Sequence, residues 1–508
     1  MNVIKKNEIK QMKNHFYLMY SFQKKENKNK SKNRCDVYVM APLDVINEEG
    51  KPSYINKFNK WCEELKEGGV DGIMIDVWWG LVEKTPKKYR WEGYEEVFKV
   101  MHNIGLKIAP VLSFHQCSGN VGDTVHIPIP KFVFENKIKP YFVDRFGQID
   151  DEYISFSYDS VKIGERTPLE MYQDFMFNFK KHFRKYIDNK TISKIEIGLG
   201  PCGELRYPSY LLSRWEYPRI GSFQCYDEMF KQMFMKDAKE AGHKDWDSPP
   251  NDTGYSYNEN PGEPTFWKSG YKSEYGKFFL NWYSQKLVEH GRNVLKIARK
   301  VFPKTHLAGK VAGIHWQYLH ESRCAEATAG YYTTNGYSCY SEIAKMFKEI
   351  NVDFCFTCLE MNGQDKHSNS APEKLVQEVF EIANKHGVKF EGENAIECYH
   401  WHAYNQILKW ASKGLKEFTF LRMTDKLMND EKTLTNFKKF TKQMHHSSSS
   451  NEKENKNKKE NENKKENEKE HKKVNEKENN EKENKNKNKK ENNNENNGYY
   501  YEDYFFMN

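Results

Sequence analysis

Long apolar runs are missing from this chain of 508 residues, and none approaches the length that a membrane-spanning helix requires. Near the N-terminus the only apolar stretch is residues 15–22, which is short and carries His, Tyr and Ser. Such a stretch is a poor core for a secretory signal peptide. We therefore expect a cytoplasmic protein with no membrane partner.

The glycine motifs of nucleotide-binding proteins are missing as well. Neither GxGxxG nor GxxxxGK followed by Ser or Thr comes after any segment that is typical of a strand. The net charge of +8 is not gathered into an arginine-rich face, because much of the lysine lies near the two ends and alternates with Glu and Asn. We expect no nucleic-acid partner, and a monomeric protein.

The two ends of the chain have little apolar sequence. Residues 1–34 form a leader rich in Asn and Lys, and residues 446–508 form a Lys/Glu/Asn tail with a short aromatic end. Within the tail, residues 451–498 hold 15 Lys and 13 Glu. Neither end can bury enough apolar surface to offset the entropy cost of folding. We expect both ends to be disordered, and one folded domain at residues 35–445.

The ten cysteines show no repeated spacing of the kind that disulfide frameworks or zinc sites have. One CxxC, Cys355-Phe-Thr-Cys358, lies in an apolar run that is typical of a strand. On a strand, positions three apart point to opposite faces, so neither a local disulfide nor a shared metal is easily built. We expect buried, reduced thiols, which suit a reducing compartment.

Between the polar ends, short apolar runs alternate with longer segments of helical periodicity. The predicted strands are residues 36–42, 70–79, 107–115, 194–200, 307–316, 352–359, 388–393 and 417–423. The clearest predicted helices are residues 55–66, 275–301, 372–386 and 430–444. Several strands are almost continuously apolar, as parallel strands covered on both faces are. Eight strand–helix repeats predict an α/β fold, the (β/α)8 TIM barrel, with an open doubly wound sheet as the alternative.

The carboxyl ends of the predicted strands are unusually polar, and in a barrel these ends form the active site. Glu204 follows the fourth strand in the segment Gly-Pro-Cys-Gly-Glu, and Glu393 ends the seventh strand after Gly392. Hydrolysis of a glycosidic bond needs a protonated carboxyl for the leaving oxygen and a second carboxylate on the opposite face of the sugar. The pair therefore favours a glycoside hydrolase, although a lone glutamate at a strand end is more often part of a structural ion pair.

Further polar and aromatic residues at the same ends suit a sugar, because aromatic rings stack on pyranose faces and ionisable groups bond hydroxyls. The candidates are Asp76, His115, Asp123, Lys310 and Arg422, each with an ion pair at the rim as the alternative. The loop of residues 117–129 has glycines near one end and prolines near the other. This favours a hinged lid, with an ordinary long barrel loop as the alternative.

Seven segments together resemble the β-amylase family. They are Val37-Tyr-Val-Met-Ala-Pro-Leu43, Gly72-Ile-Met-Ile-Asp-Val-Trp-Trp-Gly80, Ser113-Phe-His-Gln-Cys-Ser-Gly-Asn-Val-Gly-Asp123, Gly198-Leu-Gly-Pro-Cys-Gly-Glu-Leu-Arg-Tyr-Pro-Ser-Tyr210, Gly313-Ile-His-Trp316, Phe356-Thr-Cys-Leu-Glu-Met361 and Gly392-Glu-Asn-Ala395. The resemblance runs in order over roughly residues 36–444, and its motifs are long and specific.

The resemblance implies an inverting exo-hydrolase that removes β-maltose from the non-reducing ends of starch-like α-1,4-glucans, with no cofactor and no metal. By position in the motifs, Glu204 would be the general acid and Glu393 the general base. The substrate-binding residues that it implies are Asp76, His115, Asp123, Lys310, His315, Thr357, Asn394, Ala395 and Arg422. An inverting pair should stand about 6.5–9.5 Å apart or somewhat more, which leaves room for the attacking water.

The sequence also departs from the family pattern. Gln317 stands where a second tryptophan often follows Trp316, and residues 396–400 differ from the usual Leu-Pro-Arg-Tyr-Asp. These departures bear on affinity at the outer subsites more than on catalysis. Two alternatives stay open: a retaining glycosidase of another barrel family, and a non-catalytic glucan sensor on the same scaffold.

Overall fold

The computed structural model describes residues 34–446. The predicted leader and tail lie outside the described residues except at their innermost positions, and the domain boundaries stay a prediction. Among the described residues, no helix is both long enough and apolar enough to cross a membrane.

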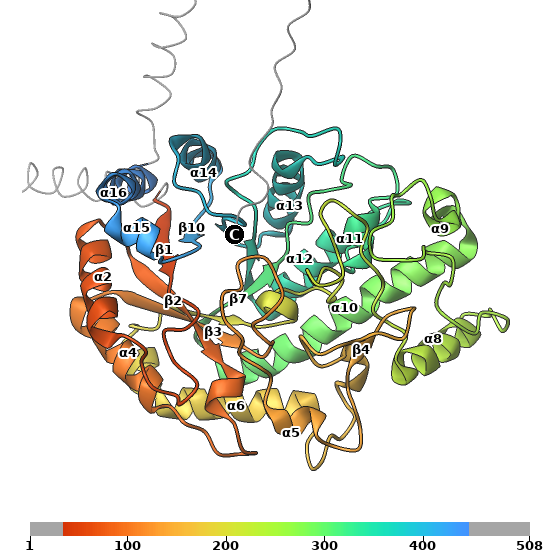
Figure 1. Cartoon of the computed structure of the whole chain (residues 1–508), viewed down its shortest axis with the longest axis horizontal. Coiled ribbons are helices and arrows are strands. Elements are labelled where there is room, and N and C mark those ends of the chain that lie inside the picture. The colour runs from red at the N-terminus through yellow and green to blue at the C-terminus, as the bar shows by residue number, and fades with distance from the viewer. Residues whose placement is uncertain (1–33, 447–508) are drawn as a thin grey trace, which may run out of the picture. The chain divides into compact units, whose positions relative to one another are not determined.

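Eight parallel strands close into a barrel in the order β1-β10-β9-β8-β7-β6-β3-β2, which confirms the predicted fold and rejects the open sheet (Figure 1). The barrel strands are β1 (Asp36–Met40), β2 (Gly72–Trp78), β3 (Lys107–Ser113), β6 (Lys194–Ile197), β7 (His306–Val311), β8 (Val352–Phe356), β9 (Phe390–Glu393) and β10 (Glu417–Phe420). All eight predicted strands are found, and most end earlier than predicted because their last residues already belong to loops at the carboxyl end. A small antiparallel pair, β4 (Phe142–Val143) and β5 (Ile149–Asp150), lies in the long segment between β3 and β6.

Helices surround the barrel, and the four clearest predictions are confirmed within one or two residues (Figure 1). The helices of eight residues or more are α2 (Ile55–Glu67), α4 (Glu92–Ile104), α6 (Pro168–His182), α8 (Glu228–Glu240), α10 (Glu274–Val301), α12 (Cys339–Ile350), α13 (Pro372–His386), α14 (Trp401–Lys413) and α16 (Glu431–His445). The shorter helices are α3 (Trp79–Val82), α5 (Lys131–Phe134), α7 (Arg184–Asp188), α9 (Thr265–Lys268), α11 (Cys324–Thr328), α15 (Asp425–Asn429), η1 (Phe156–Tyr158), η2 (Pro201–Gly203) and η3 (Gly270–Lys272).

Local sequence signals set the ends of these helices. In α13, Pro372 occupies the first helical position, where its missing N–H costs nothing, and Gly387 ends the helix with φ +66°. In α6, Thr167 and Glu170 form a capping box that satisfies exposed N–H groups of the first turn. Such ends fix where each helix returns the chain to the next strand.

The interior of the barrel contains charged as well as apolar residues. Lys194 of β6 reaches across to β9 and β10, where its ammonium lies 2.6 Å from Glu391 Oε2 and also contacts Glu417. All three side chains are buried. Because β6 borders neither β9 nor β10 in the sheet, these contacts cross the inside of the barrel.

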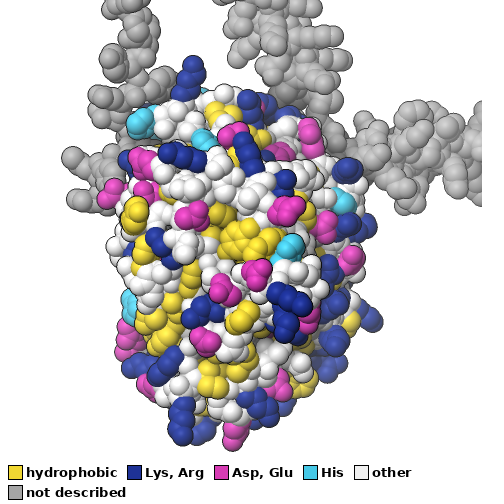
Figure 2. Space-filling model, turned by 90° about the vertical axis from the view of Figure 1, so that its right-hand side faces the viewer, with side chains coloured by type: hydrophobic (Ala, Val, Ile, Leu, Met, Phe, Trp, Pro, Cys, Tyr) yellow, Lys and Arg dark blue, Asp and Glu magenta, His cyan; other side chains and the backbone are white. Residues whose placement is uncertain are grey.

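The surface in Figure 2 shows positive and negative side chains interspersed rather than gathered by sign. This agrees with the sequence, in which the positive charge is not concentrated in an arginine-rich face. All ten cysteines are free, and nine of them are buried, as predicted.

Candidate active site

The two predicted catalytic glutamates lie at the carboxyl ends of β6 and β9, three steps apart in the barrel of eight strands. Glu393 is the last residue of β9, and Glu204 follows β6 through the short turn η2. Glycine lies close to other atoms near both, against backbone at Gly200 and against a leucine side chain at Gly392. A Cβ on Gly200 would lie 2.5 Å from the carbonyl oxygen of Glu204, and one on Gly392 would lie 2.1 Å from Leu359 Cδ2.

Lys310 of β7 connects the two glutamates. Its backbone pairs with Glu204, and its carbonyl accepts a hydrogen bond of 2.8 Å from the N–H of Leu205. Its ammonium lies 2.8 Å from Glu393 Oε2 and 3.3 Å from Glu196 Oε1. One residue therefore holds the backbone of one carboxylic acid and the charge of the other.

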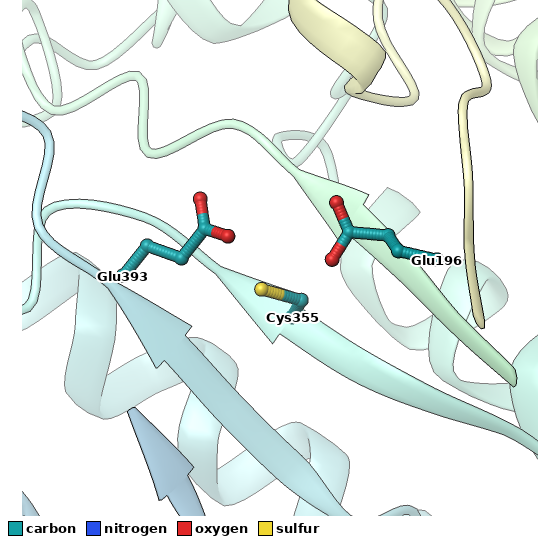
Figure 3. A group of neighbouring side chains, drawn as sticks. All are labelled: Glu196, Cys355 and Glu393. Atoms are coloured by element: carbon teal, nitrogen blue, oxygen red, sulfur yellow. The ribbon is translucent and has the colours of Figure 1, made fainter. Parts of the chain in front are cut away.

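Glu196, Cys355 and Glu393 point toward one another inside the barrel (Figure 3). Their ligand atoms lie within 4.8 Å of one another, a spacing that a metal ion could use. The ammonium of Lys310, however, already contacts both carboxylates. This lysine supplies a positive charge that offsets their negative charge.

Burial and these contacts shift the pKa values of Lys310 and Glu196. Burial alone would lower the pKa of Lys310, but the carboxylates of Glu196 and Glu393 outweigh it and raise the pKa well above its usual range. Burial raises the pKa of Glu196; the charge of Lys310 opposes that shift, and the carboxylate of Glu393 adds to it. The lysine is therefore a permanent cation, and Glu196 is suited to hold a proton.

Glu204 has a different environment from Glu393. Its side chain is 14% exposed, whereas that of Glu393 is fully buried. Its Oε2 accepts a hydrogen bond of 2.7 Å from Nε of Arg206. One carboxylate thus lies deep beside a lysine, and the other lies closer to solvent beside an arginine.

Asp76 and His115 lie on the same side of the barrel mouth. Asp76 accepts a hydrogen bond of 2.8 Å from Ser113 Oγ, and a guanidinium nitrogen of Arg422 lies 3.8 Å away. The ring of His115 packs edge-on against Trp78 with a centroid distance of 5.1 Å, and its buried Nδ1 has no hydrogen-bond partner. Burial, with the charges of Lys310 and Arg206, lowers the pKa of His115 to about 3.

Four further predicted residues belong to the loops after β7, β8 and β9. His315 Nδ1 lies 2.8 Å from Ser370 Oγ, and burial lowers the pKa of His315 to about 4. Thr357 Oγ1 accepts a hydrogen bond of 2.7 Å from the N–H of Gly313. These contacts fix both side chains at the ends of neighbouring strands.

Asn394 and Ala395 directly follow the glutamate of β9. The amide of Asn394 is buried and exchanges hydrogen bonds of 2.7 and 2.8 Å with the backbone of Leu421. The N–H of Ala395 donates to the carboxylate of Glu360 at 2.9 Å, and the residue itself is exposed. Asn394 thus joins two loops at the barrel mouth, while Ala395 is accessible there.

The 117–129 loop is closed at its base, where Cys117 and Ile127 form a two-way backbone bridge of 2.9 Å hydrogen bonds. Within it, Asp123 accepts a hydrogen bond of 3.0 Å from the N–H of Asn120. Gly119 and Gly122 have φ values of +84° and +86°, which favour glycine. The loop is therefore internally organised, and Asp123 lies within it rather than on a strand.

Sequence reasoning missed Glu196 and Arg206 as site residues. Glu196 lies inside β6, in Lys-Ile-Glu-Ile, where a charged residue within an apolar run was a usable signal. Arg206 stands two residues after Glu204, and side chains two apart in extended chain point to the same side. Both could have been found from alternation along the strand and its extension.

Similar proteins of known family identify the family of this chain. The family model described as glycosyl hydrolase family 14 matches residues 38–450. Beta-amylase 5 of Arabidopsis thaliana is 44% identical over 437 residues, which is 81% of this chain and 87% of the relative. Beta-amylase Tri a 17 of Triticum aestivum is 42% identical, over 81% of this chain and 86% of the relative.

The chain belongs to glycosyl hydrolase family 14. A solved structure agrees: the catalytic domain of the β-amylase from Paenibacillus polymyxa superimposes with a TM-score of 0.70 at 31% identity, over 80% of this chain and 98% of that one. This member of the family is therefore a glycoside hydrolase of the β-amylase type.

One departure of this family 14 chain has a structural explanation. Gln317, expected to affect outer-subsite affinity, is buried, and its amide donates a hydrogen bond of 2.9 Å to the carbonyl of Pro218. Its oxygen accepts another, of 3.0 Å, from Asn369. The side chain thus ties together three loops of the barrel mouth and supports their shape.

The low pKa of His115 predicts a pH effect on stability. In the unfolded chain this histidine takes up a proton below about pH 6.5, whereas in the folded enzyme it stays neutral down to about pH 3. Folding stability is therefore lost as the pH falls through this window. We expect the free energy of unfolding of the wild type to fall by about 2 kcal/mol more than that of His115→Gln between pH 7 and pH 5. Urea titrations at both pH values measure this, and equal losses in the two proteins would contradict it.

Proposed function

We propose that this family 14 enzyme hydrolyses α-1,4-glucosidic bonds of starch-like glucans and releases β-maltose from non-reducing ends with inversion. Glu204 acts as the general acid and Glu393 as the general base. The observation that carries the proposal is that Lys310, at the carboxyl end of the barrel, pairs through its backbone with Glu204 and through its ammonium with Glu393.

The environments of the two glutamates support their separate roles. The ammonium of Lys310 pairs with Glu393 at 2.8 Å, while burial and the neighbouring Glu393 raise the pKa of Glu196. Arg206 engages only Oε2 of Glu204, so in the acid role the proton for the leaving group would be carried on Oε1.

The reaction proceeds in one displacement. Glu393 takes a proton from a water molecule, whose oxygen attacks the anomeric carbon from the face opposite the leaving sugar. As the bond between that carbon and the glycosidic oxygen breaks, Glu204 donates its proton to the oxygen. A carboxyl separation of about 6.5–9.5 Å or somewhat more leaves space for the water.

We further propose that polar groups around the mouth hold the two sugars of the maltosyl unit. Hydrogen-bonding and charged side chains suit sugar hydroxyls. The residues assigned to this role are Asp76, His115, Asp123, Lys310, His315, Thr357, Asn394, Ala395 and Arg422. The 117–129 loop covers the chain end, which would restrict the enzyme to exo action.

The product configuration tests the reaction type. We expect fresh product from maltopentaose, followed by proton NMR, to be predominantly β-maltose. An α-configured product would instead indicate a retaining glycosidase, and a mixture of internal fragments would indicate endo action. No hydrolysis by well-folded protein would favour the glucan sensor.

Single substitutions test the two roles. We expect Glu204→Gln and Glu393→Gln each to lower kcat on maltopentaose by about 10³-fold, because an amide can neither donate nor accept the proton. Glu397→Gln is the matched control, since Glu397 lies in the loop after β9 but is exposed and 3.8 Å from Lys426. Near-normal activity of either catalytic variant, with its circular dichroism unchanged, would refute the assignment.

We also propose that the enzyme works in the cytoplasm as a monomer without membrane partners, and that it binds no nucleic acid, because its lysines lie largely near the chain ends among Glu and Asn rather than in an arginine-rich face. Light scattering coupled to gel filtration should give a mass near 60.3 kDa. A mass of twice that value would show a dimer instead.

A further inference from the structure

Arg206 forms the most direct contact to the proposed acid. It is 4% exposed, and its Nε donates to Glu204 Oε2 at 2.7 Å. The other side of the guanidinium, Nη2, donates to Asn120 Oδ1 at 3.1 Å. Nη1 donates to the carbonyl of Tyr207 at 3.2 Å. Nη2 also donates to Cys202 Sγ at 3.4 Å. The planar group is therefore held by four contacts, of which one is to the acid and one is to the 117–129 loop.

Asn120 is buried, although it lies in the exposed part of the 117–129 loop. It is 7% exposed, whereas its neighbour Val121 is 67% exposed. Its amide oxygen accepts from Arg206, and its amide nitrogen donates to the buried carboxylate of Glu152. Because a cation lies on one side and an anion on the other, the amide has one favourable orientation.

We propose that Arg206 is a positioning residue for Glu204, and that Asn120 makes this positioning depend on the 117–129 loop. The inference rests on the proposed function, because it assumes that Glu204 is the acid. With the loop in place, Asn120 fixes the guanidinium, and the guanidinium fixes the carboxyl so that Oε1 faces the leaving oxygen. When the loop moves away, Arg206 loses this contact and Glu204 loses its alignment.

The physical basis is the geometry of the two groups. A guanidinium is a rigid fork, so fixing one nitrogen restricts the direction of the others. Glu204, in contrast, stands after a turn with φ values of +55° at Cys202 and +75° at Gly203, outside the regular barrel strand. Misplacing a catalytic group by about 1 Å can cost about 10²-fold in rate. Proton donation would thus be efficient only while the loop covers the substrate.

Two substrates separate this role from a merely structural one. Maltopentaose needs a proton on its leaving oxygen, whereas α-maltosyl fluoride releases fluoride, which needs little help from an acid. We expect Arg206→Lys and Asn120→Ala each to lower kcat on maltopentaose by about 10²-fold and to change kcat on the fluoride by less than about threefold. KM for maltopentaose should change less than kcat, because the contact acts on proton transfer.

The double variant tests whether the two residues act in series. If Asn120 acts through Arg206, the combined variant should be no slower on maltopentaose than Arg206→Lys alone. Multiplied effects would overturn the coupling. Arg166→Lys is the matched control, because Arg166 is also buried and pairs with Glu83 and Asp174. It should leave the ratio of the two activities unchanged.

The outcomes separate the two proposals. Wild-type enzyme that does not hydrolyse maltopentaose would overturn both the proposed function and this inference. An active wild type whose Arg206 and Asn120 variants lose activity equally on both substrates would overturn only the positioning role. If Arg206→Lys does not fold, Asn120→Ala decides the question by the same ratio.

Discussion

The site depends on Lys310 more than on any other residue. Its backbone is the ladder partner of Glu204, while its ammonium pairs with Glu393 two strands away. Because strand positions in a closed barrel are fixed by the sheet, the backbones of Glu204 and Glu393 are fixed relative to one another. Removing a partner of such a buried ion pair leaves an uncompensated charge, which costs about 3–5 kcal/mol. The fold and the chemistry therefore share one interaction.

Charged layers along β6 explain how a barrel interior can hold so many ionisable groups. In the lower layer inside the barrel, Lys194 pairs with Glu391 and Glu417. In the next layer, which belongs to the candidate site, Glu196 pairs with Lys310. In the lower layer, Lys194 and Lys389 outweigh burial and lower the pKa of Glu391 to about 2, whereas burial and the charge of Glu391 raise that of Glu417 to about 7. Each layer approaches neutrality, which limits the cost of removing the charges from water.

The sequence predicted the fold closely because its signals are local. Apolar runs marked the eight strands, and proline and glycine marked the bounds of α13. Glu204 and Glu393 could be predicted as candidates for a similar reason, since each follows glycine at the end of a strand. The environment of these glutamates was not predictable, because the reach of Lys310 and Lys194 depends on which strands oppose one another inside the barrel. Gln317 illustrates the same limit: only the folded loops show that its amide binds other loops.

The two carboxylic acids are supported in different ways, and this difference has a structural cause. Glu393 ends a regular strand, so the ladder and Lys310 hold it without help from loops. Glu204 follows a turn of left-handed residues and cannot rely on the ladder alone for its side-chain direction. A support from outside the barrel is therefore needed, and the 117–129 loop supplies it through Asn120 and Arg206. Under the proposed roles, with the 117–129 loop covering the substrate, the alignment of the acid is linked to substrate enclosure, whereas the base is held by the barrel itself.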